Sequence, residues 1–463
     1  MSPNSLSLLT SALLPILLLS THTATLAASP ATLPRLLVLT DIGGDPDDQQ
    51  SLIRLLLHSN QLQIEGLVAS ASGTPGELGI ATTRVDLIHA TITAYKEVQP
   101  NLSLHNPNYP TAESLRNTVH PGNPQRGQHA IGPEHDTPGS NWIIQRLKHA
   151  DPRPLNISIW GGQTDLAQAL WRIRQNLSKD HLDSILQRTR VFDIADQDGL
   201  APWIQKQFPE LFYILSAAPE GADRRDAAFR GMYLEGDLDC TSREWLTEHV
   251  LQNHGPLGAL YPTRTWTAPN PHGALKEGDT PSWFFFLENG LNLPDHPEAG
   301  GWGGRYTQTS PRHFRDAADS LDGLNHTRLT VARWRPAFQS DLRARLDWCV
   351  QPPSQANHHP VAQLNNTPPP APLILHATPN STVHLDASAS SDPDQDNLSY
   401  EYSPYPEAGP HPTPLTLSNP NQPITSCFIP PNTPVGTYHV ILAVTDEGTP
   451  PMTTYRRILI EVR

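Results

Sequence analysis

The chain has 463 residues, more than one ordinary domain holds, and a formal net charge of −14. The surplus of acidic groups disfavours nucleic acid and anionic membranes as partners, because their phosphates would repel it. The 48 prolines predict many loops and linkers, and three cysteines are too few for a disulfide scaffold.

The first 28 residues have the pattern of a secretory signal peptide. An apolar run, Leu6–Leu19, is followed by small residues that end at Ala27 and Ala28, near which we expect cleavage. Asn-x-Ser/Thr triplets, for example at Asn101, are typical of secreted glycoproteins. No later apolar run is long enough to predict a membrane span. We therefore expect a secreted, extracellular protein.

Residues 36–57 (LLVLTDIGGDPDDQQSLIRLLL) carry the strongest functional signal. The apolar run Leu36–Leu39 predicts a buried strand, and the leucine spacing up to Leu57 predicts a helix directly after it. The loop between them carries four carboxylates, those of Asp41, Asp45, Asp47 and Asp48. Open α/β sheets bind ligands at the carboxyl ends of their strands, where this loop is expected. Because crowded carboxylates repel one another, Ca²⁺, a hard cation with oxygen ligands, is the expected cofactor.

A plain helix start explains part of the same pattern. Asp45 suits an N-cap, Pro46 suits the first turn, and the acids that follow favour the helix dipole. This alternative leaves Asp41, on the strand side of the turn, unexplained. Phosphate binding by this glycine-containing loop is disfavoured because the same carboxylates would repel phosphate.

Strands and helices alternate from residue 34 to residue 350, which we interpret as one domain. The expected strands are Ile64–Ser70, Leu155–Trp160, Arg190–Ile194 and Leu211–Leu215, and the expected helices are Ala81–Ala94 and Thr164–Gln175. This alternation predicts an α/β fold with a mostly parallel sheet and flanking helices. The segment Pro100–Ser140, rich in His, Pro, Asn and Gly, is predicted to be a long loop or lid. A Cys240–Cys349 disulfide within this domain is an open alternative to free thiols.

The composition changes after residue 350. Residues 351–372 are polar and rich in proline, which predicts a stiff linker. In residues 373–463 the apolar period becomes two, most clearly in Thr437–Thr445, and predicts a small all-β, Ig-like sandwich. Asp392, Asp394 and Asp396 alternate in one turn of this domain. Such a pattern is typical either of a calcium loop or of a polar turn.

Four segments together resemble a known family: Thr40–Leu52, Gly255–Pro262, Gly278–Ser282 and Gly300–Tyr306. They are similar to a secreted, nucleoside-hydrolase-like family described as cellulose-binding proteins, in which a C-terminal β domain follows the hydrolase-like domain. Nucleoside hydrolases bind Ca²⁺ with aspartates and cleave the N-glycosyl bonds of ribonucleosides. The resemblance therefore implies a secreted, Ca²⁺-dependent N-glycosyl hydrolase.

The resemblance also implies roles for individual residues. Asp41 matches the aspartate that binds Ca²⁺ and acts as the catalytic base. The other implied metal ligands are Asp48, Asp279 and the backbone carbonyl of Trp160. Asp47 matches a residue that contacts ribose. Two extra residues separate Asp41 from the Asp47-Asp48 pair, so Asp45 is an alternative to either member of the pair and a further candidate for substrate binding.

Four other residues are candidates for binding substrate. Asp196 and Asp198 follow a predicted strand where the family places ribose-binding groups, and solvated loop acids are the alternative. Trp302 offers an aromatic face to a sugar and Arg305 a guanidinium to polar groups, whereas the alternative packs Trp302 into the core.

One departure from the family leaves the function open. Gly278 stands where nucleoside hydrolases usually have a histidine near the leaving base. The alternative function is therefore a non-catalytic carbohydrate-binding protein on a hydrolase-like fold. The expected partner is a small-molecule nucleoside or glycoside in the first case and cellulose in the second, and the oligomeric state stays open.

Overall fold

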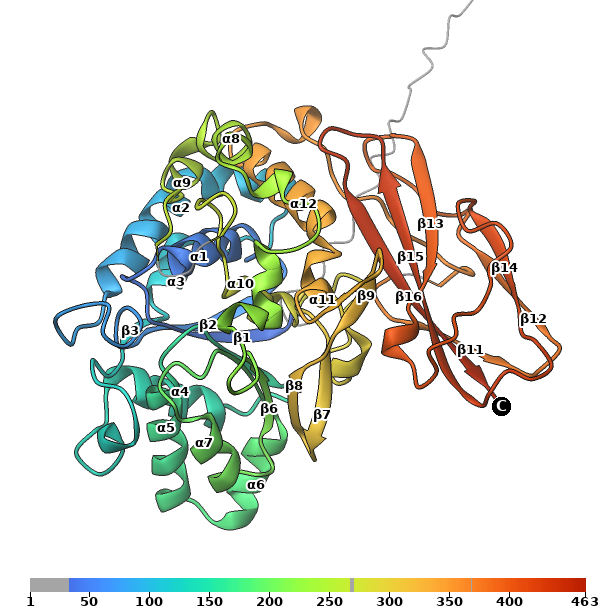
Figure 1. The fold of residues 1–463 in the computed structure, drawn as a ribbon. Coiled ribbons are helices and arrows are strands. Elements are labelled where there is room, and N and C mark those ends of the chain that lie inside the picture. The colour runs from blue at the N-terminus through green and yellow to red at the C-terminus, as the bar shows by residue number, and fades with distance from the viewer. Residues whose placement is uncertain (1–32, 267–269, 368) are drawn as a thin grey trace, which may run out of the picture.

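The computed structural model describes residues 33–266, 270–367 and 369–463 (Figure 1). The predicted signal peptide, residues 1–28, lies outside the described residues, so secretion stays a prediction. Among the helices that are described, none combines the length and the apolar character needed to cross a bilayer.

The central element is an eight-stranded sheet with the order β3-β2-β1-β4-β5-β6-β8-β7. Its strands are β1 (Arg35–Thr40), β2 (Gln63–Ala69), β3 (Val119–Pro121), β4 (Leu155–Ile159), β5 (Thr189–Ile194), β6 (Phe212–Ser216), β7 (Tyr306–Ser310) and β8 (His313–Asp316). All neighbouring pairs are parallel except β7 and β8. The mostly parallel α/β fold predicted from the alternation of elements is thus confirmed. The strand order reverses at β1 and β4, and ligands of such sheets bind at this reversal.

Helices cover both faces of the sheet (Figure 1). One face packs against α1 (Asp47–Leu57), α2 (Val85–His105), α3 (Ala112–Arg116), α10 (Thr280–Phe284) and α12 (Arg335–Asp347). The other face packs against α4 (Pro138–Lys148), α5 (Gln163–Asn176), α6 (Lys179–Gln187) and α7 (Ala201–Gln207). Three short helices, α8 (Arg243–Leu246), α9 (Gly255–Ala259) and α11 (Leu329–Ala332), complete the domain. Side chains alternate along β1, so Leu36 enters one core and Leu37 the other.

The prediction of one long loop over Pro100–Ser140 is wrong. Helix α2 continues through Pro100 to His105, and Pro100 is exposed, so its missing N–H falls on the solvent side of the helix. Thr111 then caps α3, and Thr137 caps α4 with a capping box. Composition alone indicated a loop, whereas these two threonines mark the helix starts within it.

The C-terminal domain contains two sheets. The larger has the order β11-β16-β15-β13 and the smaller pairs β12 with β14. Their strands are β11 (Leu373–Ala377), β12 (Thr382–Asp386), β13 (Leu398–Pro404), β14 (Ile424–Phe428), β15 (Gly436–Asp446) and β16 (Thr453–Val462). The segment expected as a linker packs onto this domain, because Ala362 and Leu364 are fully buried in its core. Cys240, Cys349 and Cys427 are buried and free, so the Cys240–Cys349 disulfide does not form.

Buried polar side chains join the C-terminal domain to the first. Arg457 is fully buried, and its guanidinium donates hydrogen bonds to the carbonyls of Leu291 (2.8 Å) and Gly300 (2.8 Å). The hydroxyl of Tyr405 donates to Asp319 (2.6 Å), which lies in β9 (Asp319–Leu321), a strand paired with β10 (Leu324–His326). The two domains therefore share a solvent-excluded interface with polar as well as apolar contacts.

The stability of the protein is expected to depend on pH through His439, which lies beside Arg457. Burial lowers the pKa of His439 to about 3, and the charge of Arg457 and the neighbouring His296 add to this effect. Between pH 3 and about pH 6.5 the unfolded chain binds a proton at this position that the folded chain does not. We expect the free energy of unfolding to fall as the pH falls through this range, by up to about 1.4 kcal/mol per pH unit.

Urea denaturation at several pH values, on the wild type and on His439→Gln, measures this contribution. Other groups titrate in the same range, so the difference between the two proteins is the relevant quantity. That difference should change with pH below about 6.5 and be flat above it. Parallel curves throughout would contradict the prediction.

Candidate metal centre and active site

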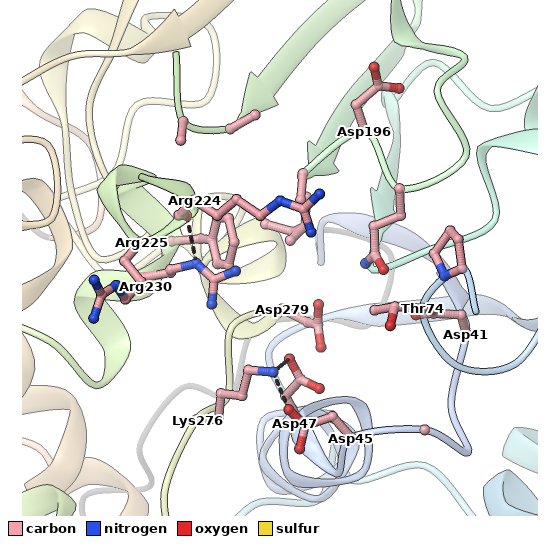
Figure 2. A pocket seen from close by; sticks show the side chains of 18 of the residues that line it. Asp41, Asp45, Asp47, Thr74, Asp196, Arg224, Arg225, Arg230, Lys276 and Asp279 are labelled. Carbon is pink, nitrogen blue, oxygen red and sulfur yellow. Dashed lines mark hydrogen bonds and ion pairs between the residues drawn. The ribbon is translucent and has the colours of Figure 1, made fainter. Parts of the chain in front are cut away.

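A cavity of about 980 Å³ opens at the carboxyl ends of the parallel strands. Its acidic lining residues are Asp41, Asp45, Asp47, Asp48, Glu77, Asp196, Asp223 and Asp279, and its basic ones are Lys276, Arg224, Arg225 and Arg230. Figure 2 shows Asp279 and Asp47 on one side of the cavity and the three arginines across it. The site therefore combines an acidic floor with a basic wall.

Three carboxylates from two distant segments meet in this floor. Oxygen atoms of Asp47, Asp48 and Asp279 all lie within 4.8 Å of one another, the one such group found among the described residues. Asp47 and Asp48 occupy the first turn of α1, and Asp279 directly precedes α10. We call these three residues the carboxylate cluster. Asp47 and Asp48 thus begin a helix as expected, but Asp45 is not its N-cap, because Pro46 holds that place and no side chain caps the helix.

The carboxylate cluster is buried and electrostatically unfavourable on its own. Burial raises the pKa of Asp279 well above its ordinary value, and the charge of Asp48 is the next largest cause. Burial likewise raises the pKa of Asp48, although its Oδ1 accepts a hydrogen bond from the hydroxyl of Thr40. Atom Oδ2 of Asp279 is buried without any hydrogen-bond partner. A group of carboxylates of this kind, two buried and one half-buried, fits Ca²⁺, which takes carboxylate oxygens as ligands.

Asp45 and Lys276 form a separate ion pair beside the cluster. The ammonium group of Lys276 contacts Asp45 Oδ2 and also lies 3.3 Å from Asp47 Oδ2 (Figure 2). Burial lowers the pKa of Lys276, but Asp47 and Asp45 outweigh it and raise that pKa above its ordinary value. Asp45 lies outside the carboxylate cluster. It therefore replaces neither Asp47 nor Asp48 there, which was the alternative that the sequence left open.

Asp41 lines the same cavity but is held by an arginine. The guanidinium of Arg126 lies 3.1 Å from Asp41 Oδ2 and 2.9 Å from Asp198 Oδ1. Burial raises the pKa of Asp41 to about 7, with Arg126 opposing the rise and Asp47 and Asp198 adding to it. A Cβ atom on Gly161 would lie 2.5 Å from Asp41 Cγ, so only glycine leaves room for this carboxylate. Asp41 is therefore fixed beside the carboxylate cluster and is not a member of it.

The carbonyl of Trp160 accepts a hydrogen bond from the side-chain amide of Gln197, a residue that lines the cavity. The backbone before Gln197 is unusual. Ala195 and Asp196 both have positive φ values, 71° and 51°. Strained backbone of this kind is common at functional sites, and here it follows β5 directly.

Both domains match family models. The model described as "Cellulose-binding Sde182, nucleoside hydrolase-like domain" matches residues 35–306, and "Cellulose-binding protein Sde0182, C-terminal domain" matches residues 382–462. The chain belongs to the Sde182 cellulose-binding, nucleoside-hydrolase-like family. The resemblance inferred from the four sequence segments is thus confirmed.

A solved structure supports this assignment across nearly the whole chain. It is a nucleoside hydrolase-related hypothetical protein from Saccharophagus degradans that is associated with carbohydrate metabolism, 33% identical, with a TM-score of 0.79. The match covers 93% of this chain and 100% of that one. The PKD domain of the KIAA 1837 protein is also similar, at 24% identity over 20% of this chain and 81% of its own, but its TM-score is 0.16. No curated protein matches the chain.

Within the Sde182 family fold, Asp196 and Asp198 differ in their position relative to the cavity. Asp196 lines the cavity, and its Oδ1 accepts hydrogen bonds from Gln163 Nε2 (2.7 Å) and from the N–H of Ala201 (2.8 Å). Asp198 does not line it. Its carboxylate accepts from the N–H and hydroxyl of Thr164 and pairs with Arg126, so it acts by positioning Arg126.

The structure places neither Trp302 nor Arg305 in the acidic cavity, so their role in sugar binding stays a prediction. Trp302 is buried among Phe284, Phe338 and Tyr455. Arg305 pairs with buried Asp319, with an Nε–Oδ1 distance of 2.7 Å. Glycines in this stretch serve close packing: a Cβ on Gly303 would lie 2.5 Å from the backbone N of Phe285. The alternative in which Trp302 packs into the core is the one observed.

The departure at Gly278 has a structural counterpart. A Cβ on Gly278 would lie 3.2 Å from the ring of Phe229, which lines the cavity. Phe229 thus occupies space next to the position where nucleoside hydrolases place their histidine. No histidine lines the cavity among the described residues.

Two of the residues that the sequence analysis missed are the cations that pair with the buried aspartates. Arg126 lies 85 positions from Asp41, and Lys276 lies 231 positions from Asp45. Nothing local distinguishes either from a solvated surface residue. A pairing argument could have found them, because buried carboxylates in one place require cations from elsewhere in the chain.

Proposed function

We propose that the chain is a Ca²⁺-dependent hydrolase that cleaves the N-glycosyl bonds of ribonucleoside-like compounds. The observation that supports this most directly is the carboxylate cluster, with its unpartnered Asp279 oxygen, at the ligand-binding edge of a nucleoside-hydrolase-like domain. Asp47, Asp48 and Asp279 would hold the ion. When bound, Ca²⁺ would supply positioning of a water molecule and of vicinal sugar hydroxyls.

The side chains around the cluster have separable tasks in this reaction. Asp41 accepts a proton from the attacking water while the oxygen of this water bonds to the anomeric carbon. Arg126 fixes the orientation of Asp41, and Asp198 fixes Arg126 in turn. As the C–N bond breaks, its electron pair leaves with the nucleobase. The nucleobase later takes a proton from solvent. The arginines across the cavity, Arg224 and Arg225, stabilise the negative charge that develops on this leaving group.

The Asp41→Asn variant tests the proposed base. An amide cannot accept the proton, so we expect hydrolysis to fall by about 10²–10⁴-fold. Ca²⁺ binding should persist, because Asp41 is not a member of the carboxylate cluster. Release of p-nitrophenol from its riboside and of bases from a nucleoside panel, with Ca²⁺ and with EDTA, measures the effect. Asp180→Asn, at an exposed position on α6, is the control. Undiminished turnover by Asp41→Asn would reject this base.

A second candidate function is carbohydrate binding without catalysis. Two observations favour it: the family is described as cellulose-binding, and the described lining of the cavity contains no histidine to protonate a leaving base. Incubation with insoluble cellulose, followed by sedimentation, separates the two functions. Retention on cellulose without base release from any nucleoside selects the binding function. Base release that EDTA abolishes selects the hydrolase.

A further inference from the structure

A second group of carboxylates lies in the C-terminal domain, far from the cavity in sequence. Asp392, Asp394 and Asp396 share the turn before β13, and Asp446 ends β15. The two segments are hydrogen-bonded to each other, because the N–H of Glu447 donates to the carbonyl of Asn397 (3.0 Å). Among the described residues, the one ion pair in this group joins His358 to Asp394 (3.0 Å). The negative charge is therefore largely uncompensated.

Asp446 adjoins this group and carries a buried, unpartnered oxygen. The residue is 2% exposed. Its Oδ1 accepts three hydrogen bonds, from Asn357 Nδ2 (2.8 Å), Gly448 N (2.9 Å) and Met452 N (3.1 Å). Its Oδ2 has no partner. Asp446 lies opposite Leu398 in the pairing of β13 with β15, so it adjoins the acidic turn, which ends just before Leu398.

Two more buried oxygens nearby lack a donor. Asp392 Oδ1 accepts from the N–H groups of Asp394 (2.8 Å) and Asp396 (3.1 Å), whereas its Oδ2 is buried and unpartnered. Asn357, 6% exposed, donates its amide to Asp446 Oδ1 and to the carbonyl of Pro450 (2.8 Å), so its Oδ1 is left unpartnered. The amide orientation is determined, because both contacts need a donor.

These three oxygens can only accept, and burying them without a partner is costly. A water molecule would offer two donors but would not offset the repulsion between Asp392 and Asp446. A hard divalent cation would partner the oxygens and also offset this repulsion, since Ca²⁺ takes six to eight oxygen ligands from carboxylates, amides and carbonyls. Zinc prefers nitrogen and sulfur ligands, which are not found among these three residues.

We propose that a second Ca²⁺ binds in the C-terminal domain, with Asp392, Asp446 and Asn357 as ligands. The ion would join three segments: the 351–372 segment, the acidic turn and the end of β15. It would also stabilise the contact between domains, because the carbonyl of Asn357 accepts a hydrogen bond from Trp348 Nε1 (2.8 Å), next to α12 of the first domain. This site is independent of the proposed hydrolase function.

Calcium titration of the full chain in an Asp279→Asn background tests the proposal, because that substitution disables the first site. By analogy with extracellular modules we expect a dissociation constant of about 10⁻⁴–10⁻³ M. About 10 mM Ca²⁺ should then raise the Tm of this variant by about 1–3 °C. Adding Asp446→Asn should abolish the rise, because an amide NH₂ would replace the Oδ2 ligand while Oδ1 keeps its three hydrogen bonds.

Two further variants make the result decisive. Asp392→Asn removes a second ligand and should also abolish the rise, which covers the case in which Asp446→Asn fails to fold. Glu401→Gln, at an exposed position on β13 of the same domain, should leave it unchanged. Absence of any Ca²⁺ effect in the Asp279→Asn background would overturn the second site and leave the first untouched. A wild type that binds one ion, still bound in Asp279→Asn, would support the second site and count against the first.

Discussion

Asp279→Asn is expected to abolish both Ca²⁺ binding at the carboxylate cluster and hydrolysis. The substitution removes one of three carboxylates that lie within 4.8 Å of one another, and with it the oxygen that has no partner in the protein. We expect turnover to fall by at least about 10³-fold, since an ion that positions both water and sugar contributes several kcal/mol to the transition state. Assays of base release and of Ca²⁺ binding measure the two losses separately.

The same variant should be at least as stable as the wild type in EDTA. Burial and the charges of Asp48 and Asp47 make the ionised form of Asp279 unfavourable, so a neutral amide relieves repulsion. Thermal unfolding in EDTA checks this, with Asp180→Asn as a surface control. A large loss of stability in EDTA would mean that Asp279 has a structural role and would weaken the argument for a metal centre.

Asp319→Ala is expected to produce the largest loss of stability. Asp319 is fully buried and accepts hydrogen bonds from Arg305 (2.7 Å), Arg333 (2.9 Å) and the hydroxyl of Tyr405 (2.6 Å). Its removal leaves two half-buried arginines without their counter-charge. Breaking a buried ion pair in this way costs about 3–5 kcal/mol. Urea denaturation measures the loss, and limited proteolysis should show earlier cleavage between the domains.

Two controls separate the charge from the contact at this interface. Tyr405→Phe removes one hydrogen bond and keeps the ring, so we expect a loss of about 1–2 kcal/mol. Asp322→Asn changes an exposed acid in the same β-hairpin, at a positive φ that asparagine tolerates, and should have little effect. If Asp319→Ala proved no more harmful than Tyr405→Phe, the interface would not depend on this buried carboxylate.

Much of the fold could be predicted from the sequence because its signals are local. The run Leu36–Leu39 and the leucines after it specify a buried strand and a helix, found as β1 and α1. The acidic loop between them was predicted to lie at the ligand-binding edge of the sheet, and it does. Local composition misled at Pro100–Ser140, where prolines and glycines hid two helix starts.

The sequence by itself determined the mostly parallel α/β domain, the β domain after it and the aspartates near residue 41, because strand and helix periods and turn residues act over a few positions. Only the tertiary structure decided which partners these and other buried aspartates meet. It brought Arg126 to Asp41, Lys276 to Asp45, and Asn357 to Asp446. The physical reason is that a buried carboxylate must find its partner wherever the folded chain places one, and that partner is often hundreds of positions away and leaves no trace in the local pattern.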